Sequence, residues 1–321
     1  MKYKSCKHLR HSIGFYRDEV VICCQSQIKT FEYYSLLKNY NGEKIDWKKL
    51  TNERIKEIEK LKNNNINKYC DGCIHVKEDF WEEYEPYIDN ITISHWTHCN
   101  CDCIYCGLDK RPKKKPYKFL PILKEMKKQN ILNFDGFLLF GGGEPTCLKE
   151  FPDILKFFYK NNIKNVQINS SGITYNREIA KYLSKEGMRL TISPDSSDRQ
   201  TYLKIKNVDK FEQVWNNIKK YAKAQKDNIY ALRTKYILIE NINDTKEQIL
   251  NWLLLSKNSG VKIVILEIES DWFAHIQNNI PEHIVNLFNY FEEAAEELGL
   301  KVEYYAIGEF IKPLMSKYQN K

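Results

Sequence analysis

From about residue 88 onward, short apolar runs alternate with amphipathic stretches, and this rhythm constrains the fold more than any other feature. Strands that alternate with helices of roughly 10–15 residues form βαβ crossovers and a parallel sheet. The expected strands are Ile88–Ser94, Phe137–Phe140, Asn165–Asn169, Arg189–Ser193, Ala231–Ile239 and Val261–Ile268. The expected helices lie near 117–130, 149–161, 175–186, 208–226, 244–258 and 281–298. The sequence therefore predicts an α/β fold.

The first 87 residues do not follow this rhythm. A charged helical stretch, Trp47–Lys62, lies between segments that carry cysteines. We expect residues 1–87 to form a small cysteine-rich domain with a boundary near Pro86, and residues 88–321 to form the α/β domain, which ends in a short tail.

Three cysteines follow directly on the expected strand Ile88–Ser94, where a parallel sheet places its functional groups. Cys99, Cys103 and Cys106 have the spacing C-x3-C-x2-C. Iron–sulfur clusters are held by cysteine thiolates at short spacings, and three ligands leave one iron of a 4Fe–4S cluster open to a small molecule. A C-x2-C pair is also found in zinc sites, so this loop alone leaves both metals open.

About 35 residues later, the run Gly141-Gly142-Gly143-Glu144-Pro145 ends the next expected strand. The loop and this run, in this order, resemble the radical S-adenosylmethionine (radical SAM) superfamily. The resemblance implies a partial (β/α)6 TIM-like barrel that binds a 4Fe–4S cluster and S-adenosylmethionine (SAM). It also implies an enzyme that cleaves SAM reductively, so that a 5′-deoxyadenosyl radical abstracts hydrogen from a substrate.

The resemblance also assigns roles in SAM binding to residues at the strand ends. Gly142 and Gly143 would let the backbone approach the methionine group, Glu144 would bind its ammonium, and Pro145 would fix the strand exit. Tyr105, just before the third cysteine, would pack against adenine.

Other strand ends carry further candidates for SAM contacts. Ser193 and Asp195 resemble a strand end that contacts the ribose or carboxylate, although Ser-Pro-Asp-Ser here replaces the commoner Ser-Ile-Asp-Gly. Ser171 resembles part of an Asn-Gly turn and is equally consistent with a plain turn. Arg199 and Asn243 are additional candidates, with solvated positions as the alternative.

Two cysteines near the loop need their own interpretation. Cys101 lies out of register, and a fourth thiolate would block SAM, so we expect it not to be a ligand. Cys147, close after Pro145, is a candidate catalytic thiol that quenches a radical, with simple packing as the alternative.

The cysteines before residue 88 predict a second metal site. Cys6, Cys24, Cys70 and Cys73 supply four thiolates, and Cys23 is the alternative to Cys24. Their order resembles the SPASM/twitch auxiliary-cluster domains of radical SAM enzymes, except that those domains usually follow the barrel. The expected occupant is a second 4Fe–4S cluster, and structural zinc is the alternative.

The composition of the chain bears on where the protein is located in the cell and on which partners it binds. No apolar run approaches the length of a membrane span, so we expect a cytoplasmic protein in which ten cysteines serve metal or redox chemistry. The net charge of +8 comes without a recognisable nucleic-acid-binding motif. We expect an external electron donor such as flavodoxin or ferredoxin.

The expected function is radical SAM modification of a peptide or protein, by analogy with SPASM/twitch enzymes. Two alternatives remain open at this point. One is radical SAM modification of a small molecule, sugar or nucleotide. The other, from a different class, is a zinc- or cluster-stabilised nucleic-acid-binding module.

Overall fold

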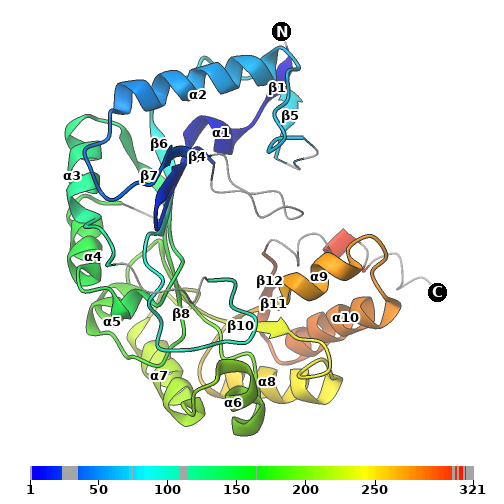
Figure 1. The fold of residues 1–321 in the computed structure, drawn as a ribbon. Coiled ribbons are helices and arrows are strands. Elements are labelled where there is room, and N and C mark those ends of the chain that lie inside the picture. Colours follow the sequence, from blue (N-terminus) through cyan, green and yellow to red (C-terminus); the bar gives the residue numbers. More distant parts are fainter. Residues whose placement is uncertain are drawn as a thin grey trace. The chain divides into compact units, whose positions relative to one another are not determined.

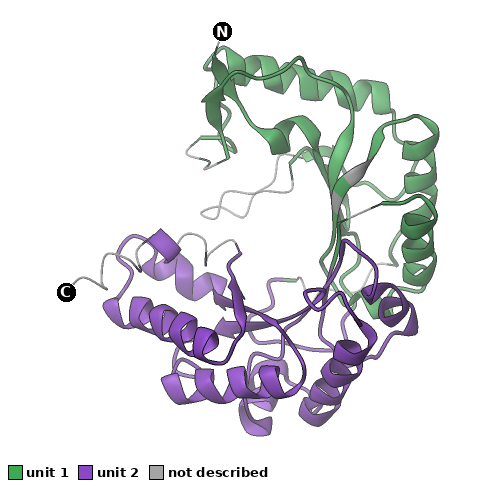
Figure 2. Cartoon of the chain, turned by 180° about the vertical axis from the view of Figure 1, so that it is seen from behind, with its two compact units in different colours: residues 1–98, 108–167 green, residues 99–107, 168–321 purple. Residues whose placement is uncertain are grey.

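The computed structural model describes residues 2–23, 35–71, 73, 75–108, 115–163, 165–305, 308, 311–313 and 315. The chain forms two compact units (Figure 2). The first unit contains residues 1–98 and 108–167, and the second contains residues 99–107 and 168–321. The chain therefore leaves the first unit for the short loop 99–107 and then returns to it.

The first unit is built on a sheet with the strand order β7-β6-β2-β3-β4. Strand β2 pairs in parallel with β6, which pairs in parallel with β7, whereas β3 and β4 are antiparallel additions. Strands β1 and β5 form a separate two-stranded sheet. The elements are β1 (Tyr3–Ser5), α1 (Lys7–His11), β2 (Ser12–Tyr16), β3 (Glu19–Val21), β4 (Ser35–Lys38), α2 (Trp47–Lys62), β5 (Lys77–Asp79), β6 (Ile88–Ser94), α3 (Leu120–Lys128), β7 (Leu132–Phe140), a 3-10 turn (Pro145–Cys147) and α4 (Phe151–Lys160).

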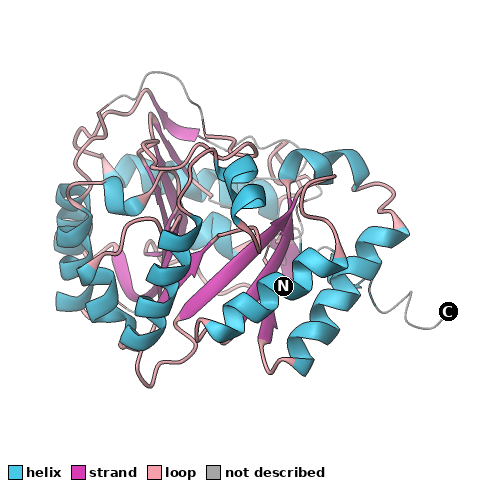
Figure 3. Ribbon diagram, turned by 90° about the horizontal axis from the view of Figure 1, so that it is seen from below, coloured by secondary structure: helices cyan, strands magenta, loops and turns pink. Residues whose placement is uncertain are grey.

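The second unit continues the βα alternation around parallel strands in the order β9-β10-β11-β12. Helices α3 and α4 flank the strands of the first unit, and α8 and α10 flank those of the second (Figures 1 and 3). The elements are β8 (Val166–Ser170), which starts in the first unit, α5 (Arg177–Leu183), β9 (Met188–Ile192), α6 (Arg199–Lys206), α7 (Phe211–Ala224), β10 (Leu232–Leu238), α8 (Lys246–Asn258), β11 (Ile263–Ile268), α9 (Ser270–Ile276), α10 (Glu282–Glu297) and β12 (Lys301–Glu303).

The predicted α/β fold with a parallel sheet is confirmed, and it is the fold class of the partial radical SAM barrel. All six predicted strands form, with ends shifted by at most a few residues, and β6 has the predicted bounds. Successive side chains of β11, from Ile263 to Ile268, are all buried, because this parallel strand is covered on both faces. No described helix is both long and apolar enough to span a membrane.

The N-terminal residues are part of the first unit's main sheet. Strand β2 lies beside β6 along its whole length, with Ser12 opposite Asn90 and Tyr16 opposite Ser94. The two compact units thus do not separate residues 1–87 from residues 88–321. A distinct function for residues 1–87 stays a prediction.

A buried arginine joins α2 to the strands that precede it. Arg54 is fully buried and donates hydrogen bonds to the carbonyls of Leu9 (2.5 Å), Ser12 (2.6 Å) and Ile22 (3.3 Å). A guanidinium carries several donors in a fixed fork, so one side chain can satisfy three separate carbonyls. Arg54 therefore fixes the segments that lead to Cys6 and Cys23.

Candidate active site

The cysteine loop, residues 99–107, is attached to the C-terminal end of α6 within the second unit. The backbone N–H of Asp102 donates to the carbonyl of Lys206 (3.1 Å), and that of Ile104 donates to the carbonyl of Ile205 (3.0 Å). The last carbonyls of a helix have no partner within the helix. The loop supplies those partners, and the helix fixes the loop in return.

The thiols of this loop lie close to one another. Cys101 is hydrogen-bonded to both Cys99 and Cys103, and its pKa is raised by these bonds. The hydrogen bond from Cys101 lowers the pKa of Cys103 to about 6, against the effect of burial. Cys106 is placed by its backbone, whose N–H donates to the carbonyl of Cys103 (3.1 Å).

This donor set fits an iron–sulfur cluster, because it offers only sulfur ligands and a thiol predisposed to lose its proton. Among the described residues, no three His, Cys, Asp or Glu side chains are arranged so that they could hold a single metal ion. Cys101, which we expect not to be a ligand, contacts two of the three predicted ligands.

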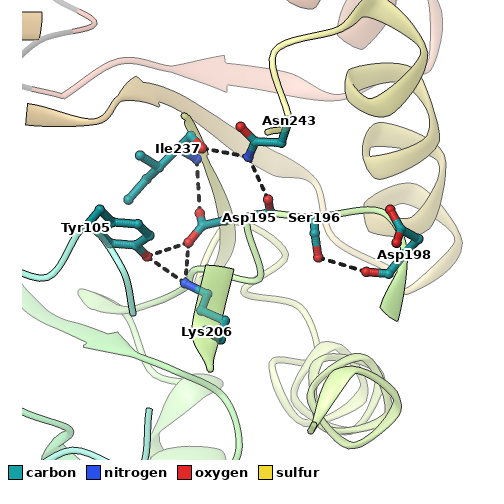
Figure 4. Close-up of polar contacts among 7 residues, drawn as sticks. All are labelled: Tyr105, Asp195, Ser196, Asp198, Lys206, Ile237 and Asn243. Atoms are coloured by element: carbon teal, nitrogen blue, oxygen red, sulfur yellow. Dashed lines mark hydrogen bonds and ion pairs between the residues drawn. The ribbon is translucent and has the colours of Figure 1, made fainter. Parts of the chain in front are cut away.

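Tyr105, which is partly buried, belongs to a polar network with the buried Asp195 and Lys206 (Figure 4). Its hydroxyl donates to Asp195 Oδ2 (2.6 Å) and accepts from Lys206 Nζ (2.6 Å). Lys206 forms an ion pair with the same carboxylate, and its Nζ lies 4.9 Å from the centre of the tyrosine ring. Burial is the largest single effect on Lys206 and opposes its charge, but Asp195, Cys103 and Cys101 together outweigh it and raise the pKa of the ammonium.

Asp195 is held from several sides. Its Oδ1 accepts from the N–H of Ile237 in β10 (3.0 Å), and its carbonyl accepts from Asn243 Nδ2 (2.8 Å). Asn243 is itself fully buried and also binds the N–H of Ile239 through Oδ1 (2.7 Å). Asp195 adopts a positive φ of 56°, a conformation that Asp and Asn tolerate better than other side chains.

These contacts bear on the predicted SAM residues of the second unit. The carboxylate of Asp195 is engaged by Lys206 and Tyr105, so its direct role toward SAM stays a prediction. The alternative of a solvated position is wrong for Asn243, which is buried. Arg199 is exposed and paired with Asp209.

Two predicted serines lie at the ends of neighbouring strands. Ser171, just after β8, donates to Asn100 Oδ1 (2.8 Å), and Asn100 Nδ2 donates to Thr174 Oγ1 (3.3 Å). Ser193, just after β9, is bonded through its N–H to the carbonyl of Ser170 (3.4 Å). Ser171 thus fixes the start of the cysteine loop through Asn100, a residue that the sequence did not single out.

The glycine run of the first unit packs against the segment that follows β6. The N–H of Gly143 donates to the carbonyl of Trp96 (3.0 Å), and the N–H of Glu144 donates to the carbonyl of His98 (2.9 Å). A Cβ on Gly143 would lie 2.3 Å from His98 O, and a Cβ on Gly142, whose φ is 81°, would lie 2.9 Å from Trp96 O. In the structure, glycine is needed here because the run packs against the chain's own backbone. That backbone continues from His98 directly into Cys99.

Glu144 is buried, and its carboxylate accepts hydrogen bonds from the backbone N–H (3.2 Å) and hydroxyl (2.7 Å) of Thr146. It thereby caps the 3-10 turn that begins at Pro145 and ends at Cys147. Cys147 is partly buried. The proposed contacts of Glu144 with SAM and of Cys147 with a radical stay predictions.

The N-terminal cysteines that are described lie around one small, largely enclosed cavity of about 30 Å³ in the first unit. Cys6, Cys23, Cys70 and Cys73 line it together with His75. Burial raises the pKa of Cys70 to about 12, and the nearby Cys6 and Cys73 act in the same direction. Of the predicted set, the structure brings Cys6, Cys70 and Cys73 together, and the fourth described cysteine beside them is Cys23. The other candidate, Cys24, lies outside the described residues.

Lys206 is the main residue that the sequence interpretation missed. The short helix α6 was not predicted because only eight residues form it and much of it is polar. Its ends carry signals that identify it, because Asp198 accepts from the N–H of Thr201 and Asn207 ends the helix with a φ of 53°. No sequence signal indicates that Lys206 is buried.

Comparison with known proteins places this geometry in a family. The family model described as the radical SAM superfamily matches residues 93–253, about half of the chain. The GTP 3′,8-cyclase of Desulforamulus reducens is 24% identical over 192 residues, which cover 58% of this chain and 57% of the relative. The corresponding enzyme of Clostridium acetobutylicum is 30% identical over 193 residues, which cover 56% of each chain.

Among solved structures, SuiB of Streptococcus suis bound to the precursor peptide SuiA has a TM-score of 0.55 at 15% identity. The match covers 86% of this chain and 58% of that one. SuiB bound to S-adenosylmethionine matches with a TM-score of 0.54 at 15% identity, over 81% of this chain and 56% of that one. The chain spans less than two thirds of the length of these relatives. The family match, the strand order and the three-cysteine loop agree: this chain is an enzyme of the radical SAM superfamily, and membership implies a 4Fe–4S cluster and SAM.

Proposed function

We propose that this enzyme uses SAM to abstract hydrogen from a peptide or protein substrate and thereby modifies it. The observation that carries the SAM chemistry is the cysteine loop, whose three spaced thiols are fixed to the end of α6. When bound, the cluster and SAM together supply one electron and a 5′-deoxyadenosyl radical, which is the hard part of the chemistry.

The chain's own residues hold and orient these groups. Cys99, Cys103 and Cys106 supply the thiolates, and the hydrogen bond from Cys101 favours the ionised form of Cys103. Glu144 lies at a strand end with its carboxylate already partly oriented by Thr146, a suitable position for a charged partner of an ammonium group. Direct contacts of SAM with Tyr105, Gly142, Gly143, Pro145, Ser171, Ser193 and Asp195 are part of the proposal.

Two lines support a peptide substrate. The structural likeness to SuiB, whose structure holds a precursor peptide, extends over most of this chain. Four N-terminal cysteines are available for an auxiliary cluster of the kind that SPASM/twitch enzymes carry. The competing candidate is a nucleotide, favoured by the sequence similarity to GTP 3′,8-cyclases.

The deciding experiment is anaerobic reconstitution with iron and sulfide, followed by incubation with SAM and dithionite. We expect 5′-deoxyadenosine to form in the wild-type enzyme and not in a Cys103→Ser variant. Adding GTP in one arm, and peptides encoded beside the gene in another, tests the substrate class by a mass change of the added compound. Failure to form 5′-deoxyadenosine overturns the SAM chemistry, whereas a changed GTP with unchanged peptides overturns only the peptide substrate.

We further propose that Cys6, Cys23, Cys70 and Cys73 hold a second 4Fe–4S cluster. Leu9 and Ile22, which also line this cavity, are held by Arg54 through their carbonyls. Four cysteines including a C-x2-C pair also suit zinc, and metal analysis distinguishes the two. About eight irons per chain would support two clusters, whereas about four irons with one zinc would support the alternative.

Electron supply from flavodoxin or ferredoxin in the cytoplasm completes the proposal. The basic run 110–116 is either a solvated loop or a segment that attracts an acidic partner, and it lies mostly outside the described residues. A flavodoxin-dependent rate of SAM cleavage that falls with added salt would support this role.

A further inference from the structure

Lys206 contacts the cysteine loop on both sides of Cys103. Its backbone carbonyl accepts from the N–H of Asp102 (3.1 Å), and its ammonium donates to the hydroxyl of Tyr105 (2.6 Å). Asp102 precedes Cys103 by one residue, and Tyr105 follows it by two. A single residue of α6 therefore holds both flanks of one predicted cluster ligand.

The position of the ammonium is fixed by groups that cannot easily move. The side chain of Lys206 is 3% exposed, and that of its ion-pair partner Asp195 is 0% exposed. Asp195 is bonded in turn to the N–H of Ile237 and to Asn243 (Figure 4). A buried charge persists only when it is paired and hydrogen-bonded, so this arrangement requires all of its members.

The same ammonium acts electrostatically on the cysteine loop. Its Nζ lies 2.6 Å from the hydroxyl of Tyr105, two residues after Cys103, and is buried against this loop. The reduction potential of an iron–sulfur cluster depends on the charges and hydrogen bonds around its sulfurs. A positive charge close to one ligand makes the addition of an electron to the cluster easier.

We propose that Lys206 is a positioning residue for the SAM-cleaving cluster, which holds the segment from Asp102 to Tyr105 in place and raises the reduction potential through its buried ammonium. The effect on the reduction potential rests on the proposed function, because it requires a cluster at Cys103. The positioning of the segment from Asp102 to Tyr105 concerns the polypeptide alone and is testable without metal.

The positioning role is tested by hydrogen exchange in the metal-free chain, followed by mass spectrometry of a peptide that covers residues 99–107. We expect Lys206→Met to speed exchange in this peptide about tenfold. Lys204→Met, on an exposed position of the same helix, is the matched control and leaves the exchange unchanged. Unchanged exchange in Lys206→Met overturns the positioning role.

Removal of the ammonium leaves Asp195 buried without its cation, so Lys206→Met is expected to be less stable. The double variant Asp195→Asn/Lys206→Met removes both charges and is expected to fold while its loop still exchanges fast. If the double variant exchanges at the wild-type rate, the positioning role is wrong.

The charge role is tested by an anaerobic redox titration of the reconstituted enzyme, followed by electron paramagnetic resonance of the reduced cluster. At a fixed potential, we expect Lys206→Met to lower the ratio of reduced to oxidised cluster about tenfold, which is 59 mV for one electron. The double variant moves back toward the wild-type value, because the opposing carboxylate is also gone.

If Lys206 has a purely structural role, the reduction potential of the cluster in Lys206→Met equals that of the wild type at equal iron content. That result overturns the charge role. If the wild-type chain binds no iron at the loop, the proposed function and the charge role both fail. The exchange experiment still decides the positioning role in that case, so the two failures are distinguishable.

Discussion

Replacement of Gly143 by alanine provides a sharp test of how the glycine run is built. The added Cβ would lie 2.3 Å from His98 O and 2.7 Å from Trp96 Cδ1. Neither neighbour can move freely, because Trp96 is buried and His98 O accepts the hydrogen bond from Glu144. The glycine run must therefore separate from the segment that precedes the cysteine loop.

The size of the effect follows from two contributions. Forcing an extra carbon into a packed site typically costs about 1–3 kcal/mol. Loss of the Glu144–His98 hydrogen bond adds about 1 kcal/mol. We expect Gly143→Ala to lower the free energy of unfolding by about 2–4 kcal/mol.

Urea-induced unfolding of the metal-free chain, followed by tryptophan fluorescence, measures this change. Gly107→Ala is the matched control, because a Cβ on Gly107 meets no atom within 4 Å although this glycine directly follows the last cysteine. We expect the control to change the stability by less than about 0.5 kcal/mol, the range of ordinary surface substitutions. A Gly143→Ala variant as stable as the control would refute the reasoning.

Other predictions concern the first unit. Arg54→Met should lower the free energy of unfolding by about 3 kcal/mol, because three buried carbonyls lose a charged donor, and a loss below about 1 kcal/mol in urea unfolding would contradict this. Burial opposes ionisation of Glu150, but the nearby His95 ring (3.7 Å) and the hydrogen bonds from the backbone N–H groups of Phe119 and Leu120 lower its pKa below 4.5. The stabilisation from the Glu150 carboxylate is therefore present above about pH 4.5 and is lost as the pH falls through the lower folded-state pKa. We expect Glu150→Gln to flatten the acid limb of a plot of unfolding free energy against pH, and an unchanged slope would contradict this prediction. Cys23→Ser should remove about four irons per chain and Cys24→Ser none, as measured by iron analysis, and the reverse result would move the fourth ligand to Cys24.

The sequence was sufficient for features that depend on local pattern. The nearly continuous apolar run of β11 and the alternating apolar residues of β6 and β9 indicated strands, and the loops that follow strands contain the cysteines and the glycine run. These features are predictable because the apolar pattern of a strand follows from which of its faces are buried.

Features that depend on distant partners were not predictable. Tyr105 and Lys206 are 101 residues apart in the chain, and lysine is seldom fully buried unless it is paired. Only the fold brings Asp195 to the same place. Likewise, nothing in the run Ser12–Tyr16 indicates that it pairs with β6 rather than with another strand.

The pairing of β2 with β6 has a consequence for attempts to isolate the catalytic barrel. A shortened chain that began at Ile88 would lose this neighbour and leave a row of backbone N–H and C=O groups exposed along an edge strand. It would also lose α1, which packs against β6. Such an edge invites pairing with another chain, so truncation at the apparent start of the barrel would produce aggregates rather than a smaller enzyme.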